Sequence, residues 1–363
     1  MDTESFLAAA CALLAVASTA DRPAELRRAL DLVLDFIGPG FTVERFESND
    51  KPSALVYPGT PRPRFRVILN GHLDVVPGSP GQFRPRRQGN RLYARGAQDM
   101  KVSALAAAQV FREIAAGLPY PVGLQLVTDE EVGGRDGTRH QIEQGVSGDF
   151  VVIGEQSGLR IVTDSKGMIT ANLRAAGRSG HAAYPWLGDN ALLKLHRSLD
   201  SLLARYPVAT REAWRTTVNV ARIETANQAR NQIPDQAEAW LDIRYPPEDA
   251  DLNGKSAAEI TAYLAEFCVP GVTPVVGHAD PPHHADPGRP EVRRLRQAAR
   301  DQGYRGDFLR KHGAADGRFY YQQGIDAVIF GIGGDGQHGA DEYADITTIA
   351  PYRRALADFL LRG

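Results

Sequence analysis

The order of strand-like and helix-like segments in the first 155 residues constrains the fold more than any other feature. Apolar runs typical of buried strands occupy 64–70, 122–128 and 150–154, and an amphipathic helical pattern occupies 101–116. Alternation of strands and helices predicts an α/β fold with a largely parallel sheet covered by helices on both faces. Ligands bind such sheets beyond the carboxyl ends of the strands. Polar residues directly after these runs are therefore the first candidates for a functional site.

Acidic and imidazole side chains occupy these strand ends and two glycine-containing loops. They are His72 and Asp74 in GHLDVVP, Asp99 in RGAQDMK, Glu130 and Glu131 in TDEEVGG, Glu155 in IGEQS, and His338 in GQHGADE. Each has an ordinary explanation by itself, such as a helix cap for Asp99 or a solvated turn for the adjacent glutamates. Taken together, they predict a metal site whose ligands come from distant parts of the chain.

The spacing within two of these motifs assigns different tasks to neighbouring residues. His72 and Asp74 are two positions apart, so on an extended backbone they share a face, and Asp74 can accept a hydrogen bond from the imidazole. Glu130 and Glu131 are adjacent at a strand end and point in different directions. One of them can therefore bind a metal while its neighbour handles a proton.

The pattern changes at about Gly167, where half-exposed strands replace buried ones. The alternating segments are 168–176, 216–223 and 237–245, with helical patterns at 190–204 and 255–268. These segments predict an α+β unit with an antiparallel sheet. A proline- and histidine-rich stretch at 278–290 is interpreted as the connector that leads back. We therefore expect a catalytic domain formed by 1–166 and 281–363, interrupted by a second domain at 167–280.

Composition excludes several classes of protein. The 363 residues are 43% hydrophobic and 24% charged, with a net charge of −2 and no clustering of Lys or Arg, which argues against a nucleic-acid or lipid-binding surface. Acidic residues precede the apolar run 6–20, so this run is expected to be a first helix rather than an export signal or membrane span. Cys11 and Cys268 are expected to be buried thiols, compatible with a reducing, cytoplasmic location.

At the level of whole motifs, the chain resembles the dinuclear zinc metallohydrolases that include acetylornithine deacetylase, succinyl-diaminopimelate desuccinylase, aminoacylase and glutamate carboxypeptidase. The resemblance covers nearly the full length. The matching motifs, in the order of the family, are GHLDVVP, LYARGAQDMK, TDEEVGG, GEQS, SGHAAYP, NQIP, DGRF and HGADE. It implies a zinc-exopeptidase-like catalytic domain with an inserted lid and dimerisation domain, and hence a homodimer.

The resemblance also implies a set of metal ligands. One divalent ion is held by His72, Glu155 and Asp99, and a second by His338, Glu131 and the same Asp99. Zinc is expected, although cobalt or manganese suits the same ligands. The resemblance further implies a cis peptide after the bridging aspartate, here Asp99–Met100.

Catalytic roles follow from the same resemblance. Glu130 corresponds to the general base that activates a metal-bridging water, and Asp74 to the carboxylate partner of His72. His181 in SGHAAYP corresponds to an oxyanion donor that reaches the partner subunit's site in dimeric relatives.

Substrate-binding positions are implied less specifically. They are Asn231, Arg244, Gly313, Asp316 and Arg318. From its place on an alternating strand, Arg244 could equally be a surface salt-bridge partner. The segment 166–168 (KGM) departs from the arginine- and serine-bearing segment expected of a true desuccinylase, so the acyl group is left open.

The predicted function is hydrolysis of an amide bond in a small N-acyl amino acid, as in a deacetylase or desuccinylase. Three alternatives stay open: a dipeptidase or carboxypeptidase with the same mechanism, an enzyme that uses a single metal ion, and a non-catalytic binding homologue. The presence of every ligand and of the base disfavours the last of these.

Overall fold

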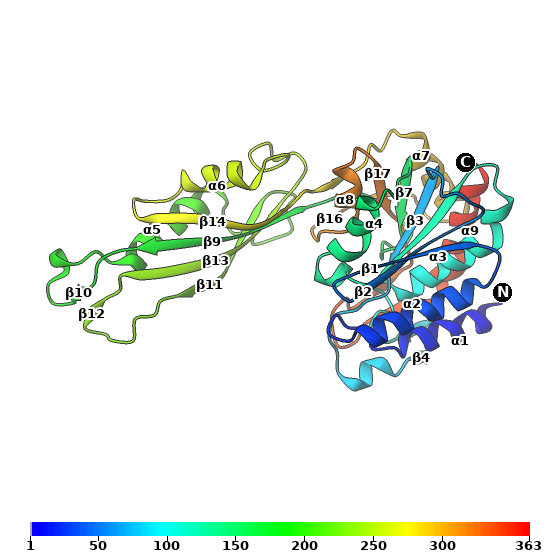
Figure 1. The fold of residues 1–363 in the computed structure, drawn as a ribbon, viewed down its shortest axis with the longest axis horizontal. Helices are drawn as coiled ribbons and strands as arrows, with labels where there is room; N and C mark the ends of the chain where they lie inside the picture. The colour runs from blue at the N-terminus through cyan, green and yellow to red at the C-terminus, as the bar shows by residue number, and fades with distance from the viewer. Residues whose placement is uncertain (1) are drawn as a thin grey trace. The chain divides into compact units, whose positions relative to one another are not determined.

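The computed structural model describes residues 2–363 and divides into two compact units. The first contains the chain up to Thr163 together with 284–310 and 315–363, and the second contains 164–283 together with 311–314. The boundaries expected from the sequence followed residues 166 and 280. Figure 1 shows the elements of both units along the chain.

The first unit is built on a mixed sheet whose centre is parallel. The central strands β6 (Val122–Val127), β3 (Val67–His72), β7 (Phe150–Ile153) and β17 (Asp326–Ile329) lie side by side in this order and run parallel. The flanking strands are β1 (Thr42–Ser48), β2 (Lys51–Tyr57), β8 (Ile161–Ser165), β15 (His283–His284) and β16 (Phe308–Lys311). The expected α/β architecture with a largely parallel sheet is therefore confirmed.

Helices cover both faces of this sheet. The larger core lies on the face covered by α1 (Thr3–Leu14), α2 (Pro23–Ile37), α3 (Lys101–Ile114), α7 (Pro290–Asp301) and α9 (Ile346–Leu361). The opposite face packs against α4 (His140–Glu143) and α8 (Gly317–Tyr321). Adjacent residues of one strand enter different cores, as Ile68 and Leu69 do in β3, because successive strand side chains point to opposite faces.

A small antiparallel sheet joins two distant parts of the first unit. Its strands, in the order β18-β19-β5-β4, are β18 (Gly334–Asp335), β19 (Tyr343–Asp345), β5 (Arg91–Tyr93) and β4 (Arg86–Gln88). Tyr343 pairs with Tyr93. This pairing places the loop between β18 and β19 close to the loop that follows β5.

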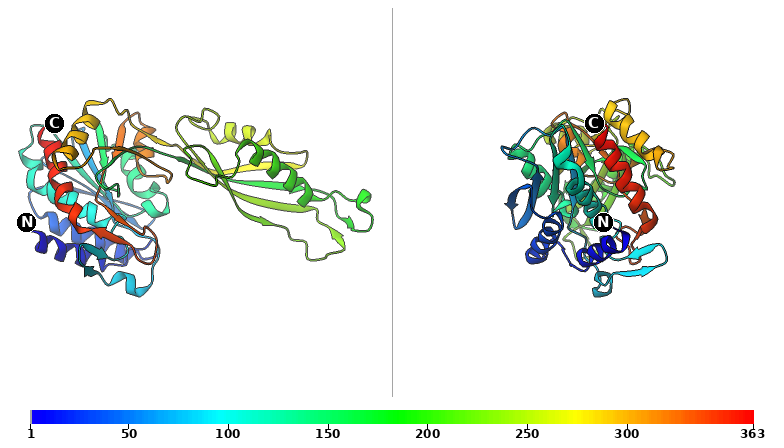
Figure 2. Two further views of the ribbon diagram at one scale, coloured as in Figure 1. Left: turned by 180° about the vertical axis from the view of Figure 1, so that it is seen from behind. Right: turned by 90° about the vertical axis from the view of Figure 1, so that its right-hand side faces the viewer.

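The second unit contains a four-stranded antiparallel sheet with helices on one face. The order is β11 (Thr217–Glu224), β13 (Gln236–Tyr245), β9 (Gly167–Ala176) and β14 (Val272–Asp280). The helices α5 (Ala191–Arg205) and α6 (Ala257–Ala265) pack on this sheet through a separate core (Figure 2). Beyond the sheet, β10 (Gly180–His181) pairs with β12 (Gln232–Ile233).

Three further expectations concern segments outside the site. The stretch 278–290 is not a plain connector, because its first residue, His278, pairs with Thr170 within strand β14 and His283 is fully buried in β15. The apolar run near the N-terminus is helical, as predicted, and within residues 2–363 no helix is long and apolar enough to cross a membrane. Cys11 and Cys268 are free and partly buried.

Candidate metal centre

His72 is the last residue of β3 and its side chain is buried at the carboxyl end of the parallel sheet. Its Nε2 atom lies 3.0 Å from Asp99 Oδ1, and its Nδ1 atom lies 3.1 Å from the carbonyl oxygen and 3.4 Å from the carboxylate of Asp74. Burial by itself lowers the pKa of this imidazole, but the contacts with Asp74 and Asp99 raise the pKa well above its usual value. The ring is thus held between two carboxyl groups.

Asp99 lies between two histidines just before helix α3, and the Asp99–Met100 peptide bond is cis, as the resemblance implied. One carboxylate oxygen contacts His72, and the other lies 3.3 Å from His338 Nε2 and accepts a hydrogen bond from Gln337. This is the position that a carboxylate shared by two cations requires.

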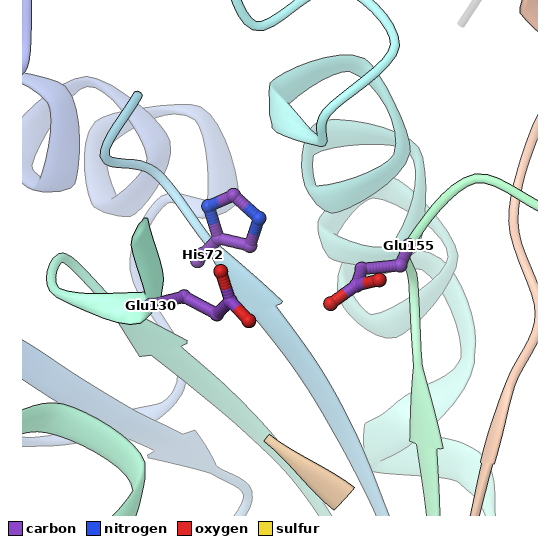
Figure 3. A group of neighbouring side chains, drawn as sticks. All are labelled: His72, Glu130 and Glu155. Atoms are coloured by element: carbon purple, nitrogen blue, oxygen red, sulfur yellow. The ribbon is translucent and has the colours of Figure 1, made fainter. Parts of the chain in front are cut away.

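The side chains form two groups with ligand atoms close together. One consists of Asp99, Glu131 and His338, and the other of His72, Glu130 and Glu155; within each group the ligand atoms lie within 4.8 Å of one another. Figure 3 shows the second group above the ends of the strands, where the carboxylates of Glu130 and Glu155 and the His72 ring face a common space. Within Asp99's group, Glu131 Oε2 is 3.1 Å from His338 Nε2.

Burial, together with nearby negative charge, raises the pKa values of Glu130 and Glu131. Burial, with repulsion from Glu155 next, raises the pKa of Glu130 well above its usual value. Burial also raises the pKa of Glu131 to about 7. Imidazole nitrogens and carboxylate oxygens that converge on one place, where the carboxylates repel one another, fit divalent cations such as zinc. The residues present therefore fit the expected pair of metal ions.

Asp74 organises the loop that carries both glutamates. Its carboxylate is fully buried and accepts the backbone N–H groups of Glu130 at 3.2 Å and Glu131 at 2.9 Å. The glutamates themselves lie in a single 3₁₀ turn, Glu130–Val132, which follows β6 after Thr128 and Asp129. Asp74 thus links the orientation of His72 to that of the glutamate turn.

Two of the predicted substrate residues are buried in the first unit. Asp316 accepts a hydrogen bond from the Thr138 hydroxyl at 2.5 Å, and Arg318 donates to the carbonyl oxygen of Gly133 at 2.8 Å. Their side chains are 1% and 3% exposed. These contacts anchor the glycine-containing loop that follows Glu131.

The remaining predicted residues lie in the second unit. His181 is exposed, and its Nδ1 atom accepts the backbone N–H of Ala183 at 3.1 Å. Arg244 donates two hydrogen bonds to Asp242, at 2.6 and 2.9 Å, which is the salt-bridge alternative left open above. Asn231 is exposed, and Gly313 has open space on the side where a Cβ atom would lie.

Sequence reasoning missed a buried ion pair beside the site. Arg95 and Glu342 both lie within the matching motifs, but nothing in their spacing, 247 residues apart, indicates that they meet. Neither residue is next to a strand end of the main sheet, so the signal that identified the ligands does not apply to them.

Comparison with known proteins decides the family. Residues 68–362 match the model of peptidase family M20/M25/M40. The chain belongs to this family. It is 28% identical to succinyl-diaminopimelate desuccinylase from Acidiphilium cryptum, covering 92% of this chain and 89% of that protein. It is 29% identical to the enzyme of the same name from Acidovorax ebreus, covering 90% and 92%.

Solved structures of this family share the fold. The aminopeptidase PepT from Bacillus cereus has a TM-score of 0.77 at 19% identity, covering 99% of this chain and 98% of that chain. The family M20 metallo-carboxypeptidase Sso-CP2 from Sulfolobus solfataricus has a TM-score of 0.76 at 16% identity, covering 99% of each chain. Family membership and the desuccinylase relatives identify the protein as a metal-dependent hydrolase of amide or peptide bonds.

Proposed function

We propose that this M20 hydrolase removes an acyl group, such as acetyl or succinyl, from an N-acyl amino acid. The observation that carries the proposal is the position of Asp99 between His72 and His338, with Glu131 and Glu155 nearby. The nearly full-length similarity to succinyl-diaminopimelate desuccinylases favours a deacylase over a peptidase.

The first unit supplies the reaction centre in this proposal. Two divalent ions would bind here, and we propose that they are zinc. Their ligands would be His72, Asp99, Glu131, Glu155 and His338. When bound, they polarise the scissile carbonyl and lower the pKa of water.

Glu130 accepts the proton of the attacking water and returns it to the leaving amine. Its buried environment, which raises its pKa, suits a group that must both take and give a proton near neutral pH. Asp74 keeps Glu130 in place by accepting its backbone N–H.

The second unit supplies His181 as the donor to the developing oxyanion. Because the Ala183 N–H occupies Nδ1, a neutral His181 carries its proton on Nε2, the atom left to donate. The exposed apolar side chains of Tyr184, Trp186, Leu187 and Leu193 in the same unit support a homodimer formed through this unit.

Recognition of the substrate carboxylate is assigned to Asn231, which is exposed, and Gly313, also exposed, is assigned to the loop near the substrate tail. The guanidinium group of Arg244 already donates two hydrogen bonds to Asp242. Arg244 would therefore have to break these bonds to bind the substrate carboxylate. Asp316 and Arg318 act in this proposal by anchoring the loop after Glu131.

Elemental analysis of the purified protein, combined with a substrate screen, tests the proposal. The screen contains N-acetyl and N-succinyl amino acids and dipeptides, each with added zinc, cobalt or manganese. We expect two ions per chain and turnover of N-acyl amino acids. Turnover of dipeptides alone would replace the deacylase with a peptidase, and a protein that binds no metal under any loading would contradict the proposed centre.

A further inference from the structure

A buried ion pair joins the loop that carries Asp99 to the loop that carries His338. Arg95 Nη1 lies 2.6 Å from Glu342 Oε2, and the two side chains are 4% and 1% exposed. Arg95 follows β5, and Glu342 immediately precedes β19. The pairing of these two strands, extended by the hydrogen bond from Ala94 N–H to the Glu342 carbonyl oxygen, brings the charges together.

Each member of the pair makes a second contact with a predicted metal ligand or its neighbour. The other carboxylate oxygen of Glu342 accepts the backbone N–H groups of Gln98 at 3.0 Å and Asp99 at 3.2 Å. The other terminal nitrogen of Arg95 donates to the carbonyl oxygen of His338 at 3.1 Å. Glu342 therefore holds the backbone at Asp99, and Arg95 holds the backbone at His338.

The backbone of His338 needs such support. Its φ angle is 59°, in the left-handed region that residues other than glycine rarely adopt. Its side chain is about half exposed, so packing alone does little to orient the ring. The Arg95 contact restrains the peptide group from which this ring extends.

We propose that Arg95 and Glu342 are positioning residues that set the separation of Asp99 and His338 for metal binding. The inference rests on the proposed metal centre. A buried ion pair by itself adds little net stability, and here its remaining hydrogen bonds go to the backbone of the ligand loops. Loss of a residue that holds a metal ligand by a hydrogen bond typically lowers metal affinity by about 10–100-fold.

Zinc titration of the metal-free protein, with a chelator as competitor, tests the proposal through binding rather than turnover. Arg95→Lys keeps a positive charge for Glu342 but loses the second terminal nitrogen, which donates to the carbonyl oxygen of His338. We expect this variant to bind one of the two zinc ions about 10–100-fold more weakly and to bind the other with unchanged affinity. Glu342→Gln is expected to lower the affinity for both zinc ions, because Glu342 holds the backbone of Asp99 and Asp99 is shared by both ions. Cobalt absorption spectra should change in both variants.

Glu291→Gln is the matched control. Glu291 is also a buried carboxylate paired with arginines in the first unit, including Arg66 at 2.7 Å. Arg66 directly precedes β3, at the opposite end of the strand from His72. This variant should lose stability without a change in zinc affinity.

A double variant keeps the proposal falsifiable if the single variants do not fold. Arg95→Met combined with Glu342→Met removes both charges, a replacement that buried ion pairs often tolerate, and it is still expected to bind zinc weakly. Folded variants with wild-type zinc affinities and cobalt spectra would overturn the positioning role alone. If the wild-type protein binds no zinc, the proposed metal centre fails and the inference fails with it.

Discussion

The fully buried Asp74 carboxylate accepts the backbone N–H of Glu131 at 2.9 Å. The same carboxylate reaches the neighbouring amide of Glu130 and lies 3.4 Å from the His72 ring. One side chain thus connects a predicted metal ligand at the end of β3 with the predicted base and a second ligand at the end of β6. Variants of the predicted base and of the predicted ligands should therefore have different effects: the first should impair proton transfer, and the second should impair metal binding.

Replacement of Glu130 by Gln should abolish proton transfer and leave the centre assembled. The amide keeps the size of the side chain but cannot accept the proton, so we expect kcat to fall by about 10²–10⁴-fold. Fold and metal content should match the wild type, as measured by circular dichroism and elemental analysis. Glu143→Gln, at an exposed position, is the control. Activity above about a tenth of the wild type would show that Glu130 is not the base.

Replacement of Asp99 by Ala should remove both metal ions together. Asp99 contacts the rings of both His72 and His338, so its carboxylate is placed to serve both groups. Elemental analysis of the folded variant is expected to show no metal. Glu155→Ala, which removes a ligand from only one group, should retain one ion. Two ions retained by the Asp99 variant would contradict the shared position.

Replacement of His181 by Ala should leave the metal content intact and lower the rate. Loss of a single oxyanion donor typically reduces kcat by about 10²–10³-fold. The measurement is kcat and KM for the best substrate of the screen, with His196→Ala, an exposed histidine of α5, as the control in the same unit. An unchanged kcat would remove His181 from the reaction.

Glu291 should make stability depend on pH. Burial opposes ionisation of this carboxyl group, but hydrogen bonds and the neighbouring arginines lower its pKa below the usual 4.5. A group with a lowered pKa in the folded state stabilises the protein above its unfolded pKa, and this contribution is lost as the pH falls through the folded value. Glu291→Gln should therefore cost about 1–2 kcal/mol at pH 7.

Urea unfolding at several pH values measures this effect. The difference between the wild type and Glu291→Gln is expected to be largest near neutral pH and to shrink as the pH falls below about 4.5. A difference that stays constant down to pH 3 would mean that the charge of Glu291 contributes nothing.

The periodicity of the sequence was sufficient to predict the parallel centre of the main sheet, the helix after Asp99 and the antiparallel second sheet. It also indicated the candidate ligands His72, Glu131 and Glu155, because a polar residue that follows a buried apolar run lies at the end of a strand. Ile68 and Leu69 illustrate why this works: side chains of a strand alternate between faces, and burial of both faces leaves a continuous apolar run.

Contacts between residues distant in the sequence could not be predicted in this way. Arg318 donates to the Gly133 carbonyl oxygen, 185 residues away, and this contact determines where its side chain lies. The pairing of Arg244 with Asp242, two residues away on the same strand, was one of two possibilities that the sequence left open, and the structure contains it. Burial of His283 within a stretch rich in proline and histidine likewise depends on a strand pairing that composition does not reveal.

The sequence alone determined the α/β architecture and the identity of the candidate ligands, because both depend on local patterns and motifs. The resemblance implied that Asp99 acts together with both His72 and His338, but only the tertiary structure showed these contacts and the ion pair of Arg95 and Glu342 that joins their loops. Those relationships depend on the pairing of β5 with β19, which brings together residues nearly 250 positions apart. Local sequence patterns do not predict such a pairing, because it forms only when the whole domain packs.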